Sequence, residues 1–87
     1  MNINILSQDN KTLVNYRNVV EISIRSKYKD FDTKELQWEI VAYYSAVSSH
    51  NVLNTVLAKY DTEERCLKEF EVLTDKIKKD IGFIYMI

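Results

Sequence analysis

Apolar and polar residues alternate with a period of two over the first two thirds of this chain. Val20, Ile22 and Ile24 alternate with polar neighbours, and a similar alternation runs from Leu36 to Tyr44. Such alternation is typical of a β-strand with one buried face. It predicts five strands, near residues 2–7, 12–16, 19–27, 35–46 and 52–59.

Short polar turns separate these strands. Turns of this length favour antiparallel hairpins, so the strands are expected to form one five-stranded β-meander. The strand at 35–46 is apolar on part of both faces, through Val41 and Tyr43. We therefore expect this strand near the centre of the sheet.

The period changes to that of a helix after Asp61. Apolar residues then recur at i, i+4, i+7 and i+11, which predicts an amphipathic helix near 62–80 with one apolar stripe: Cys66, Phe70, Leu73 and Ile77. Asp61 or Thr62 can cap its first N–H groups. Gly82, the single glycine in a chain without proline, is expected to end the helix in the left-handed conformation.

The last residues, 83–87, are expected to form a short final strand. A chain of 87 residues has room for one modest hydrophobic core, so we expect a single domain over residues 1–87. The predicted fold is α+β in the order β-β-β-β-β-α-β. Its helix packs on one face of the meander and leaves the other face uncovered.

Charge and composition narrow the expected partners. The chain carries 12 Lys and Arg against 13 Asp and Glu, a net charge of −1. This balance argues against a strongly basic nucleic-acid binder. No apolar run approaches the roughly 20 residues that span a bilayer, and no basic-then-apolar leader opens the sequence. We expect no membrane contact and a cytoplasmic location.

No pattern in the sequence indicates catalysis. His50 sits in a polar turn with no orienting acid or nucleophile at a useful spacing, so a solvated turn residue is the simpler interpretation. Cys66 lies on the apolar stripe, which favours core packing over a reactive thiol. The acids of 61–71 point in different directions on a helix, which argues against a metal site. We expect no enzymatic activity, metal or cofactor, since a glycine-rich phosphate loop is also lacking.

Four sequence fragments carry a family resemblance. Ser7-Gln8-Asp9 ends the first strand, the segment 57–65 joins the last meander strand to the helix, and Ile40-Val41-Ala42 and Tyr85-Met86 complete the pattern. Together they resemble a group of small uncharacterised proteins carried by phages, prophages and other mobile elements of low-GC Gram-positive bacteria. The resemblance implies a genetic setting in which host-takeover and counter-defence factors are common, including CRISPR–Cas inhibitors and sponges for signalling nucleotides.

The aromatic residues give the strongest functional lead. Trp38 and Tyr44 share the phase of the core residues, whereas Val41, Tyr43 and Glu39 lie on the opposite face. Exposed Tyr, Phe and Arg are enriched at binding hot spots. We therefore predict a non-enzymatic interaction module with these partner-binding residues: Arg25, Tyr28, Phe31, Glu39, Val41 and Tyr43. The competing interpretation is that the second sheet face is merely half-wet.

The genetic setting suggests the partner. We expect a host protein, or a second copy of the chain, to dock on the uncovered face, as an anti-CRISPR-like inhibitor does. The alternative is an oligomeric small-ligand binder, for example a sponge for a signalling nucleotide. In that case Tyr or Trp would stack on the base, and Arg25, Lys27 or the lysines at the helix end would meet the phosphate.

Overall fold

The computed structural model describes residues 2–44 and 53–87 of the chain. Its elements follow one another in this order: β1 (Asn4–Leu6), β2 (Leu13–Asn15), the 3₁₀ helix η1 (Tyr16–Asn18), β3 (Val19–Asp30), β4 (Glu35–Tyr44), β5 (Asn54–Tyr60), α1 (Glu63–Lys78) and β6 (Phe83–Tyr85). The α+β class and the short last strand agree with the prediction. His50 and the turn expected around it lie outside the described residues.

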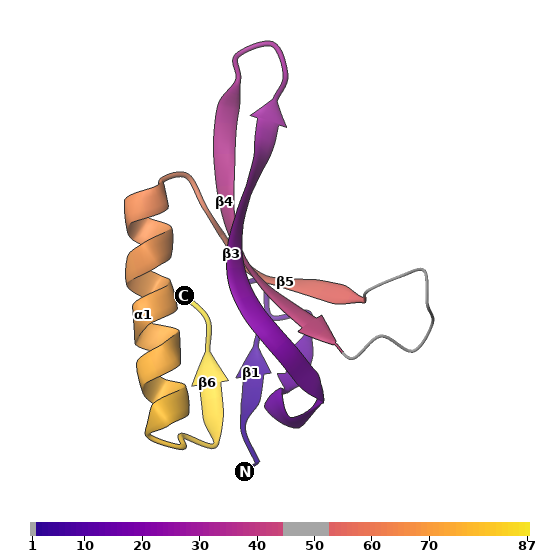
Figure 1. Ribbon diagram of the computed structural model, residues 1–87, viewed down its shortest axis with the longest axis vertical. Helices are drawn as coiled ribbons and strands as arrows, with labels where there is room; N and C mark the ends of the chain where they lie inside the picture. Colours follow the sequence, from indigo (N-terminus) through magenta and orange to yellow (C-terminus); the bar gives the residue numbers. More distant parts are fainter. Residues whose placement is uncertain (1, 45–52) are drawn as a thin grey trace.

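The described strands form two three-stranded sheets, so the prediction of a single five-stranded meander is wrong. One sheet has the order β2-β1-β6 and the other the order β3-β4-β5. In the first sheet Ile5 lies opposite Val14 in an antiparallel pair and opposite Ile84 in a parallel pair. A parallel pair requires a long crossover connection. Here the connection contains β2 and η1, followed by the whole second sheet and the helix (Figure 1).

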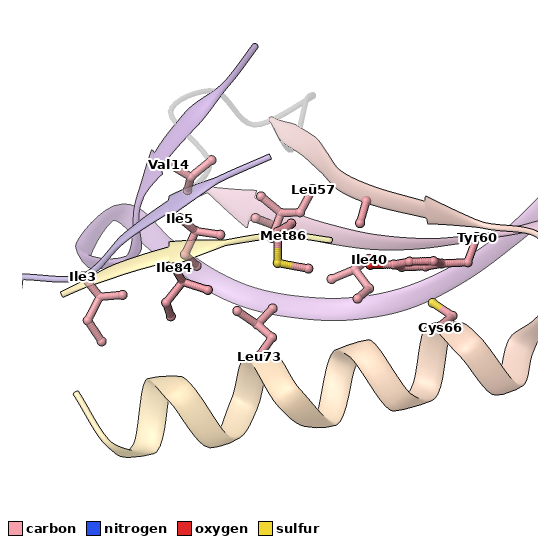
Figure 2. Close-up of a cluster of buried hydrophobic side chains, with 12 residues drawn as sticks. Ile3, Ile5, Val14, Ile40, Leu57, Tyr60, Cys66, Leu73, Ile84 and Met86 are labelled. Carbon is pink, nitrogen blue, oxygen red and sulfur yellow. The ribbon is translucent and has the colours of Figure 1, made fainter. Parts of the chain in front are cut away.

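One hydrophobic core is shared by the two sheets and α1. Figure 2 shows Cys66 and Leu73 pointing from α1 toward Ile40 of β4 and Ile84 of β6, and all four side chains are at most 2% exposed. Phe70 of the predicted stripe packs against the same core. The apolar stripe that predicted the helix is therefore the surface that joins it to both sheets.

The N-terminus of α1 begins where the sequence placed it. Thr62 is the N-cap residue, with its Oγ1 accepting a hydrogen bond from the N–H of Arg65 at 3.2 Å. Of the two capping candidates, Thr62 therefore makes the contact. Glu63 and Glu64 occupy the first turn, where negative charge complements the helix dipole.

The C-terminus of α1 corrects the expectation for Gly82. The residue in the left-handed conformation is Asp80, with φ of 55°, whereas Gly82 has no positive φ. The N–H of Asp80 donates to the carbonyl of Ile77 at 3.0 Å, and the N–H of Ile81 donates to the carbonyl of Lys76 at 3.1 Å. These two bonds form a Schellman motif, in which an aspartate occupies the position that usually carries glycine.

The turn between β1 and β2 holds the Ser-Gln-Asp segment and packs along the outer edge of β5. Ser7 Oγ donates to Asp9 Oδ1 at 2.6 Å. The N–H of Gln8 donates to the carbonyl of Leu57 at 2.7 Å, and Gln8 Oε1 accepts from the N–H of Lys59 at 2.9 Å. The turn thus covers part of a strand edge that would otherwise be free to pair with another chain.

Replacing Asp80 with glycine should stabilise the protein. Asp80→Gly is expected to raise the free energy of unfolding by about 0.5–1 kcal/mol, because glycine adopts the left-handed conformation without Cβ strain. The matched variant Gly82→Ala should cost less than about 0.5 kcal/mol, since its Cβ would make an ordinary 3.8 Å contact with the carbonyl of Asn2. Urea unfolding measures both values. A destabilised Asp80→Gly would contradict this account of the helix end.

The stability of the protein at low pH should depend on the hydrogen bond between Ser7 and Asp9. The hydrogen bond from Ser7 lowers the pKa of the Asp9 carboxyl below its ordinary value of 3.8. Because folding lowers this pKa, the contact stabilises the fold above pH 3.8 and is lost as the pH falls through the folded-state pKa. An NMR titration should find Asp9 titrating below 3.8 and, in Ser7→Ala, moving back toward 3.8. An unmoved Asp9 pKa in that variant would refute the assignment.

Candidate partner-binding surface

The two longest strands continue beyond the helix that covers their inner face. β3 has 12 residues and α1 has 16. Twelve strand residues span about 40 Å, whereas sixteen helical residues span about 24 Å. The hairpin between β3 and β4 therefore projects from the body of the protein (Figure 1). We call residues 26–36 the arm, and each of them is exposed to solvent.

Three large apolar side chains are exposed on the arm. Tyr28 is 51%, Phe31 82% and Leu36 41% exposed. Tyr28 lies opposite Leu36 in the strand ladder, and its ring centroid is 5.7 Å from that of Phe31. Strand alternation puts Tyr28 and Leu36 on the sheet face that carries Ile24 and Ile40. The apolar face of the core therefore continues onto the arm, where no helix covers it (Figure 1).

The tip of the arm is an ordered turn built around Asp30. Asp30 Oδ1 accepts a hydrogen bond from the N–H of Asp32 at 2.9 Å, and its carbonyl accepts from the N–H of Lys34 at 2.9 Å. Lys34 adopts a positive φ of 58°. The turn holds Phe31 at its tip, so less conformational entropy is lost when a partner binds there.

The face of β4 opposite the core, which we call the reverse face, carries a buried carboxylate between two cations. Glu39 is 0% exposed, Arg25 Nε donates to its Oε1 at 2.9 Å, and Lys27 Nζ lies 3.3 Å from its Oε2. The Lys27 contact is an ion pair without hydrogen-bond geometry, so Oε2 lacks a hydrogen-bond donor among the described residues. The hydrogen bond to Glu39 raises the pKa of the Arg25 guanidinium.

The reverse face is not the open docking surface that the alternation predicted. Val41 and Glu39 are both 0% exposed, so the expectation that they are accessible is wrong. β4 is the middle strand of its sheet, and Val41 lies between Ser23 on β3 and Val56 on β5. Side chains from both neighbouring strands therefore flank it. Tyr43 is half-buried on the same face.

The six predicted residues thus fall into two groups. One group shares the reverse face: Arg25, Glu39, Val41 and Tyr43. Tyr28 and Phe31 form the other group, on the arm, and they are the two of the six that are exposed, at 51% and 82%. Leu36, which was not among the predicted residues, is a third member of this group. Leu36 is two residues from Trp38, so the alternation places it on the apolar face. The alternation does not show that the helix is too short to cover Leu36.

Cys66, the other candidate residue among those described, is part of the core. Cys66 is 0% exposed, and burial raises the pKa of its thiol, which favours the protonated form and confirms the core assignment. Residues 2–44 and 53–87 hold no group of three or more His, Cys, Asp or Glu that could bind a metal ion. No helix in the described part of the chain is long and apolar enough to cross a membrane.

Comparisons with protein-family models, with curated proteins and with solved structures give no match.

The ion cluster on the reverse face should affect the stability of the protein mainly through the buried carboxylate of Glu39. Arg25→Ala is expected to destabilise the protein by about 2–3 kcal/mol, because it leaves a buried carboxylate with only Lys27 nearby. Lys27→Ala should cost less than about 1 kcal/mol, since the Lys27 side chain is 50% exposed. The double variant Arg25→Ala with Glu39→Leu should return to within about 1 kcal/mol of the native chain.

Chemical unfolding of the native chain and of these three variants measures the free energies. Equal losses in Arg25→Ala and in the double variant would show that the buried charge is not the cause.

Proposed function

We propose that this chain is a non-enzymatic protein-interaction module that binds its partner through the arm. The observation that carries the proposal is the exposed pair Tyr28 and Phe31, held on a turn that Asp30 orders. Large aromatic side chains supply much of the affinity at protein interfaces, and an ordered anchor binds at lower entropic cost. Leu36 adds apolar surface beside them.

The charges on the arm support a protein as the partner. Charges of both signs surround the aromatic pair, three cations and three anions: Lys27, Lys29, Lys34, Asp30, Asp32 and Glu35. An apolar centre with a polar rim of mixed charge is the usual anatomy of a protein interface. A nucleic acid would instead require an excess of cations to neutralise its phosphates.

The resemblance to phage and prophage proteins supports a host protein as that partner. Binding would then take place in the cytoplasm of the host cell, and the expected consequence is inhibition of a host function, including a CRISPR–Cas type of defence. The nucleotide-sponge alternative has less support. Arg25 and Lys27 face the Glu39 carboxylate, which would repel a phosphate group.

The arm should be required for binding. The native chain is used to capture proteins from a lysate of a low-GC Gram-positive bacterium, and the captured protein is purified and titrated by calorimetry. The double variant Tyr28→Ser with Phe31→Ser is expected to raise its Kd at least about 30-fold, equivalent to about 2 kcal/mol. Both side chains are exposed, so the melting temperature should hardly change.

Leu67→Ser provides the matched control, because Leu67 is 51% exposed on α1, outside the arm. This variant should leave the Kd within about threefold of the native value. A captured partner that binds the arm variant as tightly as the native chain would overturn the proposal.

A further inference from the structure

Strand β3 forms an open edge of its sheet. β4 pairs with one side of it, and no described strand pairs with the other side. Irregularities interrupt the ladder between Val19 and Glu21 and between Tyr28 and Asp30, which leaves Glu21–Tyr28 as a regular segment. Natural edge strands are commonly kept short or bulged to prevent pairing with another chain. Here the bulges lie only at the ends of a long strand.

The first five residues of this regular segment, Glu21–Arg25, are complementary to themselves. When two copies are aligned antiparallel about Ser23, Glu21 of each copy lies opposite Arg25 of the other. In the same register Ile22 lies opposite Ile24, again twice. Opposite charges and apolar side chains that face each other across an antiparallel pair both stabilise it. Both complementarities occur in one register and on opposite faces of the strand.

The guanidinium of Arg25 has further N–H donors for a contact with Glu21 of the other copy. Its Nε donates to Glu39 within the chain. An arginine carries five N–H donors, so its terminal nitrogens can meet a second carboxylate. Glu21 is exposed and accepts a hydrogen bond from Ser23 Oγ at 3.0 Å.

A cavity adjoins the same edge on its apolar side. It has a volume of about 230 Å³ and lies between the start of β3, which includes Val20 and Ile22, and α1, which contributes Phe70 and Ile77. A strand added beside β3 in the register centred on Ser23 brings its own Ile24 next to Ile22. The added isoleucine would gain apolar neighbours from β3 and α1, which favours pairing.

We propose that two copies of this chain pair antiparallel through the edge of β3, about a two-fold axis at Ser23, and so join two three-stranded sheets into one of six strands. This inference goes beyond the proposed function, because it uses the strand edge and not the aromatic residues of the arm. Antiparallel pairing directs the two arms to opposite ends of the dimer, so the tip of each arm at Phe31 lies beyond the paired strands.

Disulfide trapping tests the register. Residues opposite each other in an antiparallel pair have Cα atoms about 4.5–5.5 Å apart, which suits a disulfide. Ser23→Cys should therefore form a covalent dimer when oxidised glutathione accepts the two thiol electrons. Ser26→Cys is the matched control, because in the same register the two cysteines at position 26 lie about 20 Å apart along the strands. Cys66 is buried and should not react.

Light scattering over a concentration series tests the pairing without a new cysteine. The native chain should approach twice its monomer mass of 10.3 kDa. Glu21→Arg places like charges opposite each other and should raise the dimer Kd at least tenfold, whereas Glu71→Arg makes the same charge change on the exposed side of α1 and should not. The arm variant Tyr28→Ser with Phe31→Ser should still dimerise.

Three outcomes would overturn the inference. The native chain stays monomeric at millimolar concentration, Ser26→Cys forms the disulfide as readily as Ser23→Cys, or Glu71→Arg weakens the dimer as much as Glu21→Arg does. A monomer would mean that the end bulges and cations of β3 protect the edge. Circular dichroism confirms that each variant is folded before its mass is measured.

Discussion

The helix of this protein is shorter than the strands it covers, and this mismatch in length decides which surfaces are open. α1 buries the inner face of the sheet around Ile40, where Cys66 and Leu73 contact it. Beyond the N-terminus of α1 the same face continues without cover as far as Tyr28 and Leu36. The arm is thus an extension of the hydrophobic core into solvent. The apolar surface of the arm is unfavourable in water, and a binding partner would bury it.

The parts of the fold that depend on local pattern could be predicted, and those that depend on distant pairing could not. The stripe that includes Cys66 and Leu73 fixed the buried face of the helix, and the cap at Thr62 fixed its start. The parallel pair of β1 with β6 joins Ile5 to Ile84 across nearly the whole chain. Three-residue strands carry too few alternating positions to specify a partner, so the meander was the natural but wrong extrapolation.

The candidate site shows the same division. Alternation correctly assigned Glu39 and Val41 to the face opposite the core, yet it could not show that these two side chains are buried. The position of Glu39 follows from register, because Arg25 on β3 lies opposite it and donates to its carboxylate. The left-handed residue at the helix end was also misplaced. Glycine is the usual choice there, but Asp80 takes the position because a short polar side chain tolerates it.

The two outer strands of the sheet β3-β4-β5 differ in how far their edges are covered. The Ser-Gln-Asp turn occupies backbone groups along β5, whereas β3 has no such cover in the described chain. Pairing about a two-fold axis uses the β3 edge of both copies at once, so no β3 edge is left for a third copy. Association through β3 would therefore end as a closed pair and not as an open filament.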